Sequence, residues 1–142
     1  MRGGWRWLLL AACLPLLAAC ENSATSYSID GSHHALILVR EQPYFWTSEV
    51  NQFFIVSRLP SCQRRVAIPP DVKKLTPIEI FEAGDRLWAA RQGDRWLLAG
   101  TERCLVQDWQ NPDGRAPGPL VGSFRLESGK PSFVPAAGNE SP

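Results

Sequence analysis

The residues of this chain that could do chemistry are four cysteines, two histidines and scattered carboxylates, and few of them have the spacing of a site. His33 and His34 are adjacent, so on a strand they point to opposite faces and are poorly placed to hold one metal ion. Asp30 and Ser32 lie close in sequence, but such neighbours rarely supply the geometry of nucleophile, base and orienting group. We interpret the histidines as cap or loop residues.

The carboxylates give no stronger signal. Glu79 and Glu82 could form a catalytic pair, but on a strand they face opposite ways, and on a helix they would be surface residues. The turn-rich segment 111–119 lacks the alternating acids of a calcium loop. The sequence also has no phosphate-binding glycine loop and no dinucleotide fingerprint. We therefore predict no catalytic residue, no metal and no cofactor.

The first twenty residues are organised like a bacterial export signal. Arg2 and Arg6 give a positive start, Leu8 to Leu17 is an apolar run, and small residues precede Cys20. The run is about ten residues long, far shorter than the roughly 20 that a membrane-spanning helix needs. A signal peptide over residues 1–19 is the prediction. The alternatives are an ordinary secretory signal without lipid and a buried N-terminal helix.

The tetrad at 17–20, Leu-Ala-Ala-Cys, resembles the lipobox of bacterial lipoproteins. The resemblance covers only this segment, and it implies a diacylglycerol thioether on Cys20, the first residue of the mature protein. Cys13 ends the same tetrad, but cleavage there would leave an apolar region of about five residues, below the usual 7–15. Glu21 follows Cys20. In families that resemble those of enteric bacteria, a residue of this type after the cysteine implies sorting to the outer rather than the inner membrane.

Two thiols remain in the domain once Cys13 leaves with the signal and Cys20 carries the lipid. These are Cys62 and Cys104, and a pair of cysteines in an exported domain most often forms a disulfide. A redox or metal site is the alternative, but neither cysteine belongs to a Cys-x-x-Cys and no histidine lies near either in sequence. We predict a Cys62–Cys104 bridge.

The charge of the mature chain argues against two classes of partner. Removing the signal removes Arg2 and Arg6 and takes the net charge from +1 to −1. Such a chain lacks the basic patch of a nucleic-acid binder and the character of a polybasic membrane-surface domain. We expect no nucleic-acid partner, and membrane attachment only through the N-terminal lipid.

Composition divides the chain into four parts. Residues 1–19 are the signal peptide, and residues 20–30 are the lipidated cysteine and a small, polar stretch that predicts a flexible tether. Residues 31–134 should form a single β-rich domain. Residues 135–142 lack apolar periodicity and should be a disordered tail.

Short apolar segments rich in β-formers predict a mostly β fold, either a small antiparallel meander or sandwich or a partly open barrel. We expect strands at 35–39, 53–56, 62–68, 78–83, 86–92, 95–100, 104–109, 120–127 and 131–134. Pro69 and Pro70 should end the third of these. One short helix from Thr76 is the alternative, because Thr76 and Glu79 have the capping-box spacing, but Gly84 would stop it within two turns.

A near-repeat sets the expected register of the meander. Gly84-Asp85 and Gly93-Asp94 each separate apolar runs, which predicts two consecutive two-residue hairpin loops. With alternation along each strand, one face should be the core and the other exposed. A slip of one residue would exchange the faces. The predicted core residues are Ile78, Ile80, Leu87, Ala89, Trp96 and Leu98. The exposed face should be a candidate binding surface formed by Phe81, Arg86, Trp88 and Arg95.

Together these patterns predict an envelope lipoprotein, anchored by its lipid and facing the periplasm, that acts as a non-catalytic binding or structural module. Its partner would be an envelope protein or a glycan. The alternative function is an envelope hydrolase that acts on cell-wall or other envelope substrates.

Overall fold

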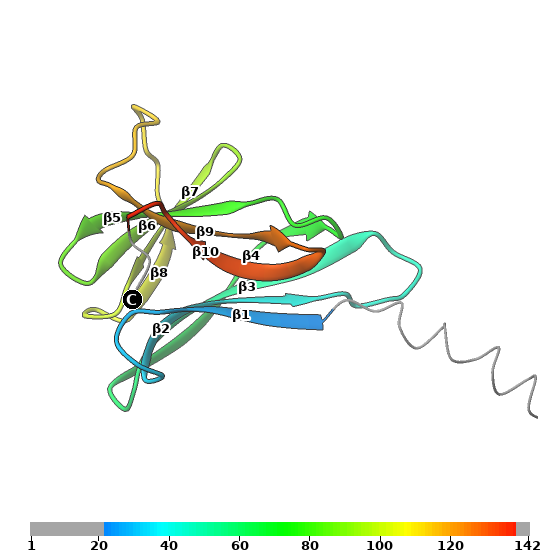
Figure 1. The fold of residues 1–142 in the computed structure, drawn as a ribbon, viewed down its shortest axis with the longest axis horizontal. Coiled ribbons are helices and arrows are strands. Elements are labelled where there is room, and N and C mark those ends of the chain that lie inside the picture. The colour runs from blue at the N-terminus through cyan, green and yellow to red at the C-terminus, as the bar shows by residue number, and fades with distance from the viewer. Residues whose placement is uncertain (1–21, 139–142) are drawn as a thin grey trace, which may run out of the picture.

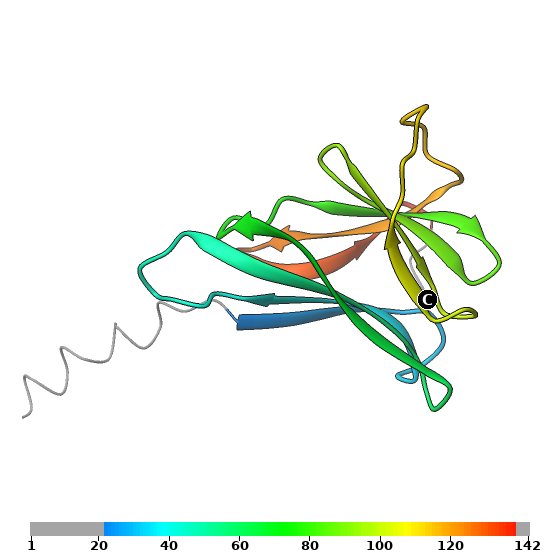
Figure 2. The ribbon, with the colours of Figure 1, turned by 180° about the vertical axis from the view of Figure 1, so that it is seen from behind.

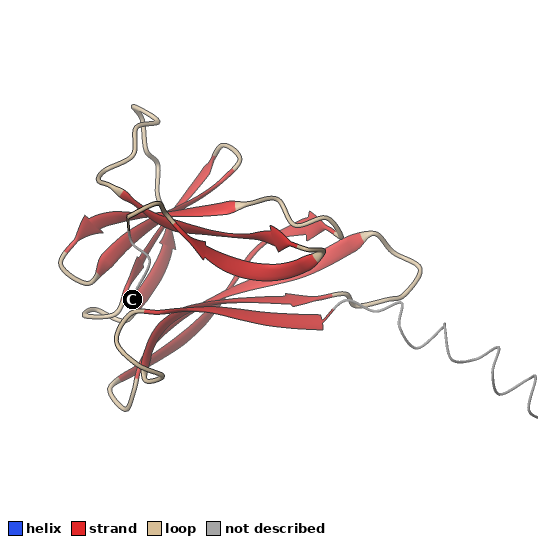
Figure 3. Cartoon of the chain, viewed as in Figure 1, coloured by secondary structure: helices blue, strands red, loops and turns tan. Residues whose placement is uncertain are grey.

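Residues 22–138 are described by the computed structural model, and in this range two antiparallel sheets pack face to face without any helix (Figures 1 and 3). The four-stranded sheet has the order β1-β2-β3-β4, and the six-stranded sheet has the order β10-β9-β5-β6-β7-β8. The strands are β1 (Asn22–Ser28), β2 (His34–Glu41), β3 (Glu49–Arg58), β4 (Cys62–Val72), β5 (Ile78–Gly84), β6 (Leu87–Gln92), β7 (Arg95–Gly100), β8 (Leu105–Asp108), β9 (Leu120–Glu127) and β10 (Lys130–Pro135).

This arrangement confirms the mostly β prediction and selects the sandwich, since the sheets do not close into a barrel. Seen from the front and from behind, the sheets form two layers (Figures 1 and 2). The segment from Thr76 is not helical, because β5 begins at Ile78. The predicted signal peptide, the predicted lipidation site Cys20 and residues 139–142 lie outside the described residues.

The core lies between the two layers. Every second residue of β3 from Val50 to Val56 is buried, as the two-residue period of a strand requires. Phe54 of β3 meets Phe124 of β9 across the interface, with ring centroids 6.2 Å apart. The main apolar members of this core are Leu36, Leu38, Phe54, Val56, Ile78, Ile80, Trp88, Ala90, Leu97, Ala99, Val106, Val121 and Phe124.

Two predicted hairpins are confirmed. In the β6–β7 hairpin Arg91 lies opposite Trp96, and the loop is Gly93-Asp94, with Gly93 at a φ of 60°. A positive φ at the first loop position favours glycine. The β9–β10 hairpin turns at Ser128 and Gly129, as expected.

The first hairpin of the meander departs from the predicted register by one residue. Its loop is Asp85-Arg86 rather than Gly84-Asp85, and Arg86 takes the left-handed conformation with a φ of 48°. The pairing shifts between Glu82 and Gly84, which adds a residue to β5 and moves its pairing with β6. Phe81 therefore lies opposite Ala89, not opposite Trp88.

This shift exchanges the predicted faces of β6 and β7. Ile78 and Ile80 of β5 face the core as predicted, but Trp88 faces the core with them and is only 7% exposed. The expectation that part of the Trp88 ring is accessible is therefore wrong. Trp96 is also 7% exposed, yet it packs on the outer face of the six-stranded sheet with Phe81.

The predicted disulfide is present. Cys62 at the start of β4 is bonded to Cys104, just before β8, with Cα atoms 5.5 Å apart. The bond closes a sequence separation of 42 residues. It ties the edge strand of one sheet to the edge strand of the other.

The strand assignment is wrong at two places. Residues 22–28 are not a tether but strand β1, which pairs with β2 in one continuous register. Their small polar side chains suit an edge strand, while Tyr27 packs against Phe133 on the other sheet. Pro69 and Pro70 do not end β4, which continues to Val72. An edge strand tolerates proline, and the pairing between β3 and β4 is irregular at this point.

Candidate functional site

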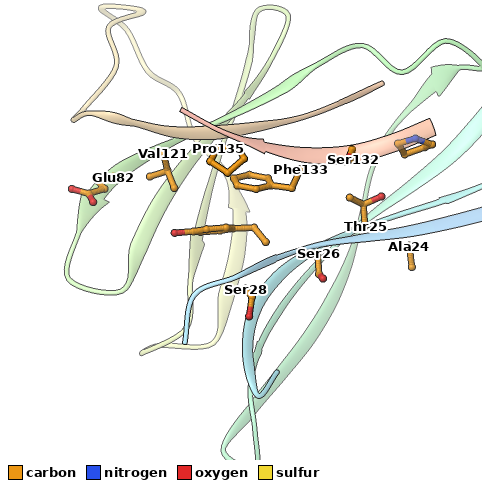
Figure 4. Close-up of a pocket in the computed structure, with 11 residues that line it drawn as sticks. Ala24, Thr25, Ser26, Ser28, Glu82, Val121, Ser132, Phe133 and Pro135 are labelled. Carbon is orange, nitrogen blue, oxygen red and sulfur yellow. The ribbon is translucent and has the colours of Figure 1, made fainter. Parts of the chain in front are cut away.

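A groove of about 1020 Å³ lies on the open side of the sandwich, between β1 and β10 (Figure 4). One wall is β1 from Ala24 to Ser28, and the other is β10 with Val121 of β9 and Glu82 of β5. Figure 4 shows the Thr25 side chain reaching toward β10, while Ser26 and Ser28 point away from it. The groove therefore has a mixed surface of hydroxyls, aromatic rings and one carboxylate.

An aromatic pair joins the two walls. Tyr27 stacks on Phe133 with ring centroids 4.5 Å apart, and the two rings connect β1 to β10. Burial raises the pKa of the Tyr27 phenol, and the nearby Glu82 carboxylate raises it further. The phenol therefore remains protonated at neutral pH and is available as a hydrogen-bond donor in the groove.

Strand β1 has a free backbone edge beside this groove. Ile29 N–H donates to the His34 carbonyl at 2.8 Å, so the backbone groups of Ile29 face β2, and the β1–β2 pairing has no interruption. The direction of the backbone groups alternates from residue to residue, so the N–H and C=O groups of Ala24 and Ser26 face away from β2. Among residues 22–138, β1 pairs with β2 alone. Its outer edge is a template for another strand.

Strand β10 has an edge that is closed to pairing. Ala136 N–H donates to the Val121 carbonyl at 2.9 Å, so by the same alternation residues 131, 133 and 135 present their backbone outward. Pro131 and Pro135 have no N–H, which leaves only Phe133 with an outward donor. Prolines at these positions protect an edge without breaking the ladder to the neighbouring strand. The two walls of the groove therefore differ: β1 can accept a strand, and β10 cannot readily do so.

The four residues of the predicted binding surface are not brought together. Trp88 lies in the core and Phe81 is buried on the outer face, where Trp96 and Trp109 pack beside it. Arg86 is at the hairpin turn and pairs with Glu102 at 2.8 Å, and Arg95 is exposed at the start of β7.

Sequence reasoning missed the groove because its first wall fell in the segment that was predicted to be a tether. One signal was available. Pro131 begins a predicted strand and Pro135 directly follows it, so if the strand continues by one residue their missing N–H groups lie on one side, as at a protected edge.

His34 forms a contact that resembles the histidine–hydroxyl pair of a catalytic site. Its Nε2 lies 2.7 Å from the Thr101 hydroxyl and joins the two sheets. Thr101 is fully buried, so no substrate could reach this hydroxyl without opening the sandwich. Within residues 22–138 no three His, Cys, Asp or Glu side chains gather as a metal site would require. The pair therefore has the features of an inter-sheet contact.

We expect His34 to make stability fall as the pH drops through the weakly acidic range. Burial lowers the pKa of its imidazole, Arg86 and Arg58 lower it further, and Asp30 opposes them. The unfolded chain then binds a proton more readily than the folded one below about pH 6.5. Stability is lost from that pH down to the folded-state pKa.

Thermal unfolding at pH 7.0 and pH 5.5 measures this effect. The loss of Tm between the two pH values should be smaller in His34→Gln than in the natural protein. An equal loss in both proteins would show that His34 does not cause it.

No protein-family model matches the chain, and the searches of curated proteins and of solved structures gave no significant match. None of the described residues form a helix long and apolar enough to cross a membrane.

Proposed function

We propose that this chain is a lipoprotein of the bacterial cell envelope, anchored through Cys20 and facing the periplasm, whose domain binds an extended peptide of another envelope protein along β1. The proposed anchor follows from the N-terminal sequence, and Glu21 favours the outer membrane. The Cys62–Cys104 disulfide supports an oxidising compartment, since disulfides are rare in the bacterial cytosol.

The observation that carries the binding proposal is the free β1 edge beside a groove. An added strand would pair with the outward N–H and C=O groups of Ala24 and Ser26, which supply affinity that is independent of sequence. Its alternate side chains would contact the groove, where Tyr27 and Phe133 offer apolar contact and Glu82 offers a charge. Edge and groove together would select a peptide by both backbone and side chains.

A peptide fits these groups better than a glycan does. Sugar rings commonly stack on an accessible aromatic face, but Trp88 is enclosed in the core and the Tyr27 and Phe133 rings stack on each other. A strand edge, in contrast, offers regularly spaced donors and acceptors that match another peptide backbone. The contact between His34 and the buried Thr101 hydroxyl is closed to substrate, so it does not favour the hydrolase alternative.

The proposal predicts that Ser26→Pro weakens partner binding about tenfold, because an interfacial hydrogen bond of about 1–1.5 kcal/mol is removed. The substitution removes an outward N–H and leaves the β1–β2 ladder intact, as Pro131 and Pro135 do in β10. Ser26→Ala is the matched control, since it loses the side chain but keeps the N–H.

Photo-crosslinking in cells from position 28, at the end of the same edge, measures the effect. The crosslinked product should contain one defined protein. Its yield should be unchanged in Ser26→Ala and reduced in Ser26→Pro, and the Tm of each variant should show that it is folded. An adduct of equal yield in Ser26→Pro, or one that contains glycan, would contradict strand addition.

A further inference from the structure

The loop between β2 and β3 carries three consecutive aromatic residues that the domain does not bury. Tyr44 is 54% exposed, Phe45 is 55% exposed and Trp46 is 69% exposed. Large apolar side chains gathered in one exposed patch usually mark a surface that contacts a partner or a membrane.

This loop is held in shape by its own hydrogen bonds. The Gln42 side-chain amide donates to the Thr47 carbonyl at 2.6 Å, and the Thr47 N–H donates to the Tyr44 carbonyl at 3.2 Å. The rings also pack together, with the Trp46 centroid 4.8 Å from that of Tyr44 and 4.9 Å from that of Phe45. The aromatic tip, residues 44–46, is therefore preformed.

The corner between β4 and β5 lies beside the aromatic tip and adds apolar surface and positive charge. Val72 is 54% exposed and is followed by Lys73 and Lys74. Lys73 N–H donates to the Ser48 carbonyl at 3.1 Å, which places the corner next to the β2–β3 loop.

A buried ion pair fixes this corner. Arg40 is fully buried, lies 3.5 Å from Asp71, and donates to the Lys73 carbonyl at 3.3 Å. Two acids also lie at this end of the sandwich. Glu41 is paired with Arg65 at 3.0 Å, and Glu49 is exposed opposite Val72.

The chain enters the domain at the same end. Asn22, the first residue of β1, lies opposite Glu41, the last residue of β2. In Figure 1, β1 begins where the cyan β2–β3 loop leaves the sheet. Cys20 is two residues before Asn22, and two residues of chain reach at most about 7 Å.

We infer that this end of the sandwich, with residues 44–46 and 72–74, is a membrane contact in which the aromatic tip enters the interface of the bilayer that holds the lipid. The inference rests on the proposed lipid at Cys20. A lipid so close to the tip would keep the bilayer surface within its reach. Tryptophan and tyrosine favour the membrane interface because their rings are apolar and carry a polar group.

The two lysines complete the match to a membrane surface, since anionic headgroups attract basic residues near the surface. Contact at this end would set the orientation of the domain. Strand β1 would then run away from the membrane, and its free edge would remain open to a partner along its length.

Tryptophan quenching by brominated lipids tests the contact. The full lipoprotein, as purified from membranes, is reconstituted into vesicles of zwitterionic and anionic lipids with bromine on the acyl chains. Fluorescence of the natural protein should be quenched relative to unbrominated vesicles. Trp46→Phe should lose most of this quenching, whereas Trp109→Phe, a matched change beside Trp96, should retain it. The double change Lys73→Glu and Lys74→Glu should reduce the quenching.

Quenching that persists in Trp46→Phe, or its absence from the natural protein, would overturn the membrane contact. Labelled palmitate tests the lipid separately. A protein that is labelled at Cys20 but shows no Trp46 quenching refutes this inference alone, whereas an unlabelled protein refutes the proposed anchor.

Discussion

Trp88→Ala should lower the free energy of unfolding by about 3–5 kcal/mol, as large-to-small changes of buried aromatic residues do. Trp88 is 7% exposed and packs between the sheets, and the centroid of its ring lies 6.1 Å from the centroid of the His34 ring. Truncation would leave a cavity between the sheets. The hydrogen-bonded strands on both sides cannot easily move to fill it. Urea unfolding followed by circular dichroism measures the change.

Arg95→Ala is the control for this experiment, because Arg95 is exposed on the same meander and should change stability by less than about 0.5 kcal/mol. A loss below about 1 kcal/mol for Trp88→Ala would mean that Trp88 is a surface residue, as the register read from the sequence had predicted. A loss in the core range supports the shifted pairing of β5 and β6.

Removing the disulfide should cost about 4 kcal/mol in the double variant Cys62→Ala, Cys104→Ala, the value that the chain-entropy account gives for the loop it closes. The bond spans 42 residues and joins edge strands of opposite sheets, so its loss frees much of the unfolded chain. Chemical denaturation of the natural protein and the double variant measures the difference. Reduction of the natural protein should reproduce most of the loss. Equal midpoints before and after reduction would contradict a structural role for the bond.

Much of the fold could be predicted because buried strands leave short apolar segments rich in β-formers in the sequence. These segments located the strands from β2 to β10, and Gly93 identified the β6–β7 loop. The Cys62–Cys104 pair could be predicted by elimination, since only two thiols remained in the domain.

The register of the β5–β6 hairpin could not be predicted, because Gly84-Asp85 and Gly93-Asp94 are the same dipeptide in similar contexts. The β5–β6 hairpin differs from the β6–β7 hairpin because Arg86 adopts a positive φ and β5 gains a residue. Neither feature has a local sequence signature. One displaced residue was enough to exchange Trp88 and Trp96 between the two faces of the sheet.

The candidate sites could not be predicted for a different reason. The groove is formed by β1 and β10, which come from opposite ends of the domain, and the small polar residues of β1 resemble a linker. The exposure of Trp46 also depends on tertiary structure, since an aromatic run is equally suited to a core.

Metabolic labelling with palmitate tests the central claim, that the domain is held at a membrane by a lipid on Cys20. The natural protein and Cys13→Ala should incorporate label and remain in the membrane fraction. Cys20→Ala should incorporate none and should be released from that fraction. Label in the Cys20→Ala protein would contradict a lipid on Cys20.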